Sequence, residues 1–260
     1  MNTMMLYGFV VAVGAVVGSF LNVCIHRIPK QQSIVWPASH CPVCGTAIAP
    51  YDNIPVVSYF LLRGRCRHCS GRISLQYPAV EAANALGYGL ILWRFGLGWP
   101  ALVYAALFSA LLVVAVIDLE HQIIPNVVTL PGIPLGLLCA STILPVGFPN
   151  SVIGGLLGGG LLWGLAWASP YLFGKEGMGG GDIKLLTMIG AFLGWKPTLL
   201  TILIGAVVGS AVGLTMMALK LLRRNQYVPF GPFLALGAMT SLFFHEAIWA
   251  WYLGFFGLDK

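Results

Sequence analysis

Charged residues are scarce in this chain. Lys, Arg, Asp and Glu make up 8% of its 260 residues, and only eight residues are acidic. A soluble globular domain carries roughly a quarter of its residues as charged side chains. The shortage of charge, together with 58% hydrophobic residues and a mean hydropathy of +0.87, therefore excludes a soluble globular protein and predicts a helical one that crosses a membrane several times.

The apolar stretches have the lengths that membrane helices need, which is about 20 residues each. We expect an all-α polytopic membrane protein with eight transmembrane helices. The sixth is the shortest, because Trp195, Lys196 and Pro197 leave only a narrow turn before the seventh. The expected spans are residues 4–25, 79–95, 99–117, 124–145, 151–173, 183–195, 198–220 and 231–254.

Basic residues are missing from the first seven positions, and no small-residue cleavage site follows the first apolar stretch. A cleaved secretion signal needs both features. Positive residues follow the stretch instead, beginning at Arg27. We therefore expect the first span to be a retained anchor whose C-terminal end faces the cytoplasm.

The remaining basic residues test this orientation, because Lys and Arg accumulate in short cytoplasmic loops. Eleven of the fourteen fall on the cytoplasmic side and three on the outside, so with eight spans both termini lie outside. Since the basic residues are spread over several loops and the aromatic residues lie chiefly in spans, nucleic-acid binding is not expected. The cytoplasmic set is Arg27, Lys30, Arg63, Arg65, Arg67, Arg72, Lys175, Lys184, Lys220, Arg223 and Arg224, and the outer set is Arg94, Lys196 and Lys260.

Cysteine is also rare, and four of the six cysteines stand in two Cys-x-x-Cys pairs within the polar loop of residues 27–78. Each pair presents two thiolates from one turn, and two pairs complete a tetrahedral zinc site. Two disulfides are the alternative, but disulfides rarely persist in the cytoplasm. We predict a closed, structural zinc site with the ligands Cys41, Cys44, Cys66 and Cys69. His40 and His68 flank these ligands without being needed, and Cys24 and Cys139 are expected to be packing residues.

The few acidic residues draw attention to Asp118 and Asp182, which lie at the edges of apolar stretches. Under the predicted topology both face the cytoplasm. A carboxylate at the end of a membrane helix is costly and is therefore a candidate for function. The run Gly177-Met178-Gly179-Gly180-Gly181 breaks the backbone directly before Asp182. Two aspartates that share a site do not both ionise easily, so together they can serve as general base and general acid. Helix capping by Asp182 is the structural alternative.

Glycines elsewhere lie within apolar stretches at four-residue spacing, as in Gly14 and Gly18, Gly154 and Gly158, and Gly205 and Gly209. This spacing lets membrane helices approach closely. No Gly-x-Gly-x-x-Gly follows a strand pattern, so a dinucleotide site is not indicated. Asn22, Glu81 and Asn84 are polar groups in or beside spans that could bridge helices by hydrogen bonds. Glu120 follows Asp118 by two residues and therefore points off the same helical face, and Glu81, Glu176 and Glu246 have no evident carboxylate partner.

Several blocks, in order, resemble the type IV prepilin leader peptidases of bacterial inner membranes, and they cover nearly the whole chain. The blocks are Gly18-Ser-Phe-Leu-Asn-Val-Cys-Ile-His-Arg-Ile-Pro29, His40 through Tyr51-Asp-Asn-Ile-Pro55 to Arg63-Gly-Arg-Cys66, Tyr77-Pro-Ala-Val-Glu81, Ile117-Asp118 leading to Ile124-Pro125, and Gly174-Lys-Glu-Gly-Met-Gly-Gly-Gly-Asp182-Ile-Lys184.

The resemblance implies that Asp118 and Asp182 are the catalytic pair of an aspartic endopeptidase in the inner membrane, with both termini in the periplasm. Its substrates would be type IV prepilins and type II secretion pseudopilins, cut after a glycine. Members with the cysteine loop also N-methylate the new terminus from S-adenosylmethionine, for which Gly64 is our candidate residue. Relatives often carry Asp after the Ile-Pro pair, whereas this chain has Asn126.

Two other functions stay open at this point. A proton-coupled transporter would use the two aspartates as relay groups. An assembly scaffold with a zinc docking loop would need neither aspartate. The expected organisation is a first transmembrane helix at residues 1–26, a zinc-binding loop at 27–78, a peptidase core at 79–260, and contacts with membrane lipids.

Overall fold

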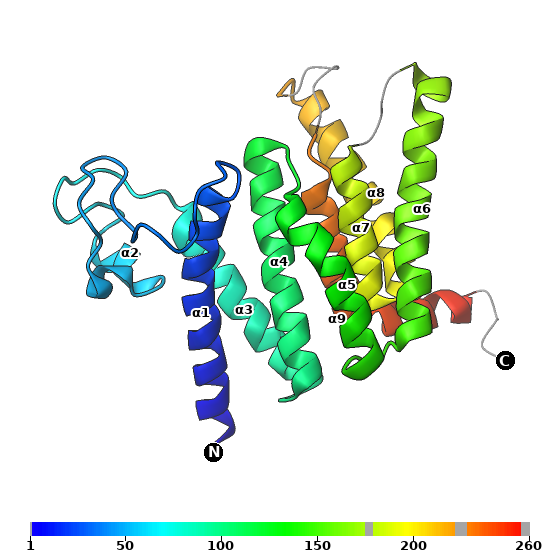
Figure 1. Ribbon diagram of the computed structural model, residues 1–260, viewed down its shortest axis with the longest axis horizontal. Helices are drawn as coiled ribbons and strands as arrows, with labels where there is room; N and C mark the ends of the chain where they lie inside the picture. Colours follow the sequence, from blue (N-terminus) through cyan, green and yellow to red (C-terminus); the bar gives the residue numbers. More distant parts are fainter. Residues whose placement is uncertain (1, 175–178, 222–227, 256–260) are drawn as a thin grey trace. The chain divides into compact units, whose positions relative to one another are not determined.

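The computed structural model describes residues 2–174, 179–221 and 228–255. Their regular secondary structure is helical (Figure 1), apart from two isolated antiparallel bridges in the cysteine loop. The predicted all-α class is thereby confirmed. The chain divides into two compact units, Met1–Val113 and Val114–Lys260, and the boundary falls inside helix α4 (Trp99–His121). The predicted division at residues 26 and 78 stays a prediction.

The first unit is built on two long helices, α1 (Thr3–Arg27) and α3 (Gln76–Phe95), which pack along each other. The loop between them contains a short 3-10 helix, η1 (Pro50–Asn53), and one helical turn, α2 (Val57–Leu61). A Cβ added at Gly18 would lie 2.7 Å from the Cα of Glu81. The predicted close packing through glycine is therefore confirmed for this helix pair.

Buried amide and carboxyl groups join the elements of the first unit. The Asn84 side chain donates to the Gly14 carbonyl at 2.7 Å and accepts from the Ser109 hydroxyl at 2.8 Å. Asn22 donates to the Tyr77 carbonyl at 3.1 Å. The Glu81 carboxylate accepts from the Val56 N–H at 2.7 Å and so connects the cysteine loop to α3. These contacts confirm the expected polar bridges.

The second unit surrounds α7 (Gly180–Leu193), which packs against four other helices. Their bounds are α5 (Asn126–Thr142), α6 (Phe148–Phe173), α8 (Trp195–Ala218) and α9 (Gly231–Phe255). Leu185, Leu186 and Ile189 of α7 are fully buried. The buried part of α7 begins at Leu185, so Asp182 lies within one turn of a closely packed segment that has little freedom to shift.

Glycine contacts set the distance between α7 and α6. A Cβ added at Gly154 would lie 2.5 Å from the Gly190 carbonyl oxygen, and one at Gly158 would lie 2.8 Å from that of Leu186. On α8, a Cβ at Gly209 would meet the Phe233 ring at 3.1 Å. The glycine-rich patches therefore serve helix packing, as the spacing predicted.

Five of the described helices are long and apolar enough to cross a membrane, namely α1, α4, α6, α8 and α9. The apolar helix α5 is shorter, with 17 residues. Although α3 and α7 coincide with expected spans, α7 has only 14 residues and α3 carries Glu81, Asn84 and Arg94. A membrane protein with several spans is supported, and the count of eight stays a prediction.

The predicted turn at residues 195–197 is wrong. Helix α7 ends at Leu193, α8 begins at Trp195, and Gly194 alone makes the junction. Its φ of +80° lies in the region that glycine adopts without steric cost. Pro197 instead occupies the first turn of α8, where its missing N–H costs no helical hydrogen bond.

Candidate active site and metal centre

Asp118 lies in the last turns of α4 and is only 5% exposed. One of its carboxylate oxygens, Oδ2, accepts a hydrogen bond from the Gly231 N–H at 2.9 Å. Gly231 is the first residue of α9, where backbone N–H groups have no partner within the helix. The start of α9 thus holds the Asp118 carboxyl group in place.

Asp182 is the third residue of α7, and its carboxylate hydrogen-bonds with the Gly179 backbone at the start of the helix. The other oxygen, Oδ1, is buried and has no hydrogen-bond partner in the part of the chain that the structure describes. Capping of the helix therefore accounts for one oxygen of Asp182 and leaves the second unexplained. A buried carboxyl oxygen without a partner is costly and commonly marks a functional group.

Both aspartates line one cleft of about 340 Å³ in the second unit. Ile124 helps to form the cleft, since a Cβ added at Gly181 or Gly231 would contact its side chain. The lining residues are Asp118, Gln122, Ile123, Ile124, Asn126, Gly179, Gly180, Gly181, Asp182 and Lys184.

Part of the predicted glycine run lies outside the described residues, namely Gly177 and Met178. The same holds for Lys175, Glu176, Arg223, Arg224 and Lys260. Gly179, Gly180 and Gly181 are described, and all three line the cleft. The glycines that directly precede Asp182 thus let the backbone come close to the candidate reaction site.

A cation and an amide complete the polar lining of the cleft. The Lys184 ammonium donates to the Asn126 Oδ1 at 2.9 Å. Asn126 is the first residue of α5, and Lys184 follows Asp182 by two positions on α7. Asn126, the residue at which the sequence departs from the family pattern, therefore accepts a hydrogen bond from Lys184.

The cysteine loop forms two turns of the same design. The Cys41 N–H donates to the Thr46 carbonyl at 2.9 Å, and the Cys66 N–H donates to the Gly71 carbonyl at 2.8 Å. The Gly45 N–H donates to the Cys41 carbonyl, and the Ser70 N–H donates to the Cys66 carbonyl, both at 2.9 Å. Each pair of cysteines is thus presented from a tight hydrogen-bonded knuckle.

The four predicted ligands meet at one point, since the sulfur atoms of Cys41, Cys44, Cys66 and Cys69 lie within 4.8 Å of one another. The Cys41 and Cys69 sulfurs are 3.8 Å apart. A tetrahedral zinc ion with bonds of about 2.3 Å separates its sulfur ligands by roughly 3.8 Å, so the cluster fits this metal. Hydrogen bonds with the Thr46 side chain and backbone lower the pKa of the Cys44 thiol to about 6, which favours the thiolate that binds metal.

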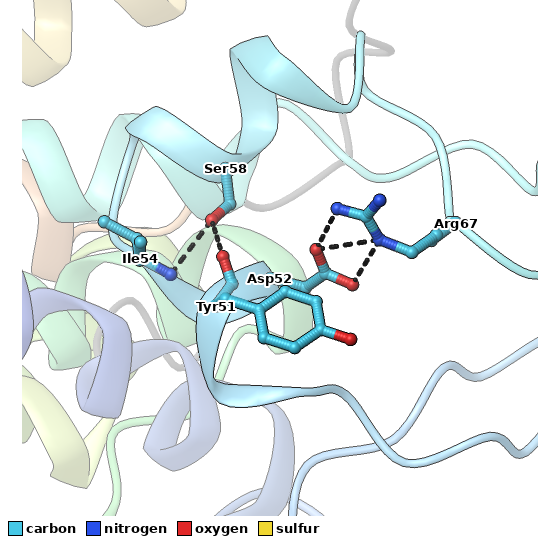
Figure 2. Close-up of polar contacts among 5 residues, drawn as sticks. All are labelled: Tyr51, Asp52, Ile54, Ser58 and Arg67. Carbon is cyan, nitrogen blue, oxygen red and sulfur yellow. Dashed lines mark hydrogen bonds and ion pairs between the residues drawn. The ribbon is translucent and has the colours of Figure 1, made fainter.

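An ion pair attaches the second knuckle to the preceding segment (Figure 2). The Arg67 guanidinium donates to both carboxylate oxygens of Asp52, with distances between 2.6 and 3.1 Å. This pairing lowers the pKa of the Asp52 carboxyl group. The Ser58 hydroxyl in turn donates to the Tyr51 carbonyl at 3.1 Å and accepts from the Ile54 N–H at 3.0 Å. Residues 51–58 are therefore held against the cysteine cluster by side-chain contacts.

Two comparisons, one with models of protein families and one with individual known proteins, give consistent results. Residues 12–95 match the family model described as "Bacterial Peptidase A24 N-terminal domain", and residues 105–214 match "Type IV leader peptidase family". A protein of Pseudomonas aeruginosa named "Prepilin leader peptidase/N-methyltransferase" is 38% identical, over 95% of this chain and 93% of its own. The chain belongs to the type IV leader peptidase family. Proteins of the same name from Burkholderia pseudomallei and Aeromonas hydrophila are 38% and 36% identical, over 93% and 91% of this chain and 86% and 90% of their own. No solved structure matches the chain.

The two candidate sites lie in different segments of the family match. The cysteine cluster lies in the N-terminal segment, and both aspartates lie in the leader peptidase segment. The resemblance noted in the sequence is thereby confirmed at the level of the family. The roles of the individual aspartates and cysteines stay predictions.

Gly64, the candidate for methyl transfer, has a structural reason to be glycine. Its φ is +66°, and an added Cβ would lie 2.8 Å from the Tyr59 hydroxyl oxygen. Its carbonyl also accepts from the Ile73 N–H at 2.8 Å. These constraints explain the residue without any cofactor, so the role of Gly64 in methyl transfer stays a prediction.

Sequence reasoning missed the contribution of Gly231 to the candidate active site. It lies 113 residues from Asp118, and no local pattern connects the two. The available signal was the pair Gly231-Pro232, since proline favours the first turn of a helix. That signal predicts where α9 begins but not which carboxylate its first N–H meets.

Proposed function

We propose that this chain is a membrane aspartic endopeptidase that removes the short basic leader from type IV prepilins and type II secretion pseudopilins, with cleavage after a glycine. The observation that carries the proposal is the single cleft lined by Asp118 and Asp182. The name shared by the relatives supports the substrate class.

The reaction needs only the two carboxyl groups and water. The ionised member of the pair takes a proton from water, and the resulting hydroxide adds to the scissile carbonyl carbon. The protonated member gives its proton to the carbonyl oxygen. Collapse of this intermediate breaks the C–N bond, and the amine leaves with a proton from the pair. The Gly231 N–H keeps Asp118 oriented, while the buried Oδ1 of Asp182, which has no hydrogen-bond partner among the described residues, would bond to the water or the carbonyl in the substrate complex.

The flanking glycines suit an extended substrate. Gly179, Gly180 and Gly181 present backbone without side chains to the cleft, which leaves room for a peptide segment beside the aspartates. Lys184 stands on the same rim and has two further N–H donors besides the one that Asn126 accepts. These groups would hold peptide carbonyls near the reacting atoms.

Zinc, held by Cys41, Cys44, Cys66 and Cys69, would have a structural role. Four thiolates fill the tetrahedral positions and leave none for a reacting water. The metal would fix the two knuckles, and the pair formed by Arg67 and Asp52 would extend this order to η1.

We further propose that the protein N-methylates the new terminus of the processed pilin. The name of the relatives includes N-methyltransferase, which supports the second activity. S-adenosylmethionine would supply the methyl group. The positive φ of Gly64 and its contact with Tyr59 already account for a glycine at this position.

The proposed location is the bacterial inner membrane, with the aspartates and the cysteine loop on the cytoplasmic side and both termini in the periplasm. The distribution of Lys and Arg supports this orientation. Prepilins, pseudopilins and membrane lipids are the proposed partners, and nucleic acid is not one of them.

The test is cleavage of a purified prepilin by the reconstituted enzyme. We expect Asp118→Asn and Asp182→Asn each to abolish leader removal while the protein remains folded. Glu120→Gln is the matched control, since Glu120 lies two residues after Asp118 on an exposed part of α4 and should leave cleavage intact. Full cleavage by either aspartate variant would rule out the dyad. An ion flux without any cleavage would favour the transporter instead, which the comparisons do not support.

A further inference from the structure

Three arginines of the cysteine loop carry charges that no acidic side chain balances. Arg63, Arg65 and Arg72 are exposed, and none of them forms an ion pair within the described part of the chain. Arg65 and Arg72 stand opposite each other across an antiparallel bridge. Like charges in this position repel each other, so an anion bound between them would relieve a real cost.

The fourth arginine of this region provides an internal contrast. Arg67 is paired with both oxygens of Asp52 (Figure 2). Asp52 is the only acidic residue between positions 28 and 75, where the sequence has Lys30 and four arginines. The one carboxylate of this segment is therefore taken by Arg67, and in the described part of the chain the other three arginines have no carboxylate partner, so their charges are available to an anion.

Exposed apolar side chains lie directly beside these cations. Phe60 and Leu61 of α2 are 69% and 74% exposed. The Arg63 N–H donates to the Phe60 carbonyl, and the Arg65 N–H donates to the Leu62 carbonyl, both at 3.1 Å. The apolar turn and the arginines therefore form one tightly folded surface, which we call the arginine patch: Phe60, Leu61, Arg63, Arg65 and Arg72.

The attachment of the loop limits which partner this surface can meet. The loop leaves α1, a helix apolar and long enough to span a membrane, and returns to α3, which packs along α1. Both ends of the loop are thus fixed at the end of a membrane helix, where lipid headgroups are the most abundant anions. Basic residues combined with exposed aromatic and aliphatic side chains are the features that bind an anionic lipid surface.

We propose that the arginine patch docks on anionic lipid headgroups, with Phe60 and Leu61 inserted at the level of the acyl boundary. Docking would place the cysteine cluster against the membrane surface. This proposal does not depend on the catalytic dyad, so loss of cleavage in an aspartate variant leaves it intact.

The test compares lipids on the purified full-length chain in neutral detergent. Phosphatidylglycerol or phosphatidylcholine is titrated in, and bound lipid is counted by native mass spectrometry. We expect a clear preference for phosphatidylglycerol. Each arginine near an anionic surface is worth about fivefold in affinity, so R65Q/R72Q should weaken binding of phosphatidylglycerol about 25-fold. The matched control K196Q/K220Q removes two exposed charges outside the patch and should change it much less.

Further arms separate the competing explanations. L61S should weaken the binding of both lipids, because Leu61 contributes apolar contact and no charge. Inorganic phosphate alone should not displace the lipid. Equal affinity for the two lipids, or equal losses in R65Q/R72Q and K196Q/K220Q, would overturn the proposal. It would also be overturned if R65Q/R72Q lost bound zinc but kept the lipid preference, since the arginines would then serve the metal cluster.

Discussion

Glycine at position 231 allows a backbone N–H to reach the Asp118 carboxylate at 2.9 Å. A Cβ at this position would lie 2.7 Å from the Asp118 Oδ2 and 3.3 Å from the Ile124 side chain. Neither side chain can easily move aside to make room, because Asp118 is buried and Ile124 also lies against Gly181. The orientation of the candidate catalytic carboxylate thus depends on a missing side chain.

Gly231→Ala should therefore impair cleavage severely. The added methyl group would push the Asp118 carboxylate away, and misplacement of a reacting group by about 1 Å can cost roughly 100-fold in rate. The measurement is kcat/KM for leader removal. Gly164→Ala is the control, since nothing lies within 4 Å of a Cβ added there. Unchanged cleavage by Gly231→Ala would show that this hydrogen bond does not position the carboxylate.

The two cysteine knuckles differ at one equivalent position. Gly45 and Ser70 both follow the first cysteine of their pair by four residues, and both have positive φ, +71° and +57°. An L-residue with a side chain pays roughly 1–2 kcal/mol in this region, whereas glycine does not. The second knuckle therefore carries a backbone cost that the first avoids.

Ser70→Gly should stabilise the loop by about 1 kcal/mol, and Gly45→Ala should destabilise it by a similar amount. No atom lies within 4 Å of a Cβ added at Gly45, so the second change tests φ alone. The opening free energy of the Cys41 and Cys66 amides, from native-state hydrogen exchange, is the quantity to compare. Two variants that move this value in the same direction would contradict the interpretation.

Helix α7 carries a candidate catalytic residue and also packs against most of the other helices of its unit. It carries Asp182 at its first turn and is enclosed by α5, α6, α8 and α9. Its separation from α6 is set by Gly154 and Gly190, whose backbones touch. Close approach of this kind is how helices associate in lipid, where the hydrophobic effect does not drive them together.

Gly154→Ala should separate α6 from α7 and thereby lower both thermal stability and cleavage. Overpacking of a tight contact typically costs about 1–3 kcal/mol. Gly160→Ala on the same helix meets nothing within 4 Å and provides the comparison. Thermal unfolding in detergent and prepilin cleavage would be measured for both variants. A Gly154→Ala protein as stable and active as Gly160→Ala would mean that this contact is not limiting.

At the scale of the whole molecule, the two candidate centres belong to different units. The cysteine cluster lies in Met1–Val113, and both aspartates lie in Val114–Lys260. Each unit has its own buried side chains, such as Asn84 in the first and Leu185 in the second. Disturbance of one centre should therefore remain largely within its own unit.

Removal of zinc tests this separation. A chelator should raise hydrogen exchange at the Cys41, Gly45, Cys66 and Ser70 amides, since the metal fixes both knuckles. Exchange in α7 should stay unchanged, because that helix is held by its own packing. A protein whose α7 amides became exposed together with the loop would instead behave as a single cooperative unit.

Much of the architecture could be read from the sequence, because it depends on local pattern. Runs of apolar residues predict the helices, and the Cys-x-x-Cys pairs predict the four sulfurs that the structure gathers. Four-residue glycine spacing predicts close approach of helices, and the structure shows it between α1 and α3 and between α6 and α7. Each prediction relies on residues a few positions apart, whose relation is fixed by helix or turn geometry.

The local sequence pattern gave a wrong prediction for the junction between α7 and α8, where the conformation of a single residue sets the structure. Gly194 makes the junction between α7 and α8 by itself, because its positive φ replaces the longer turn expected at residues 195–197. Helix length also limited the prediction of spans, since the 14 residues of α7 are apolar but shorter than a typical crossing.

The sequence by itself determined the helical membrane class, the four-cysteine cluster and the family resemblance, because composition and short spacings carry that information. Only the tertiary structure decided that Asp118 and Asp182 share a cleft, that the Gly231 N–H holds one of them, and that Lys184 meets Asn126. The physical reason is distance along the chain. Contacts between residues 58 to 113 positions apart depend on how α4, α5, α7 and α9 pack, and no local pattern records this packing.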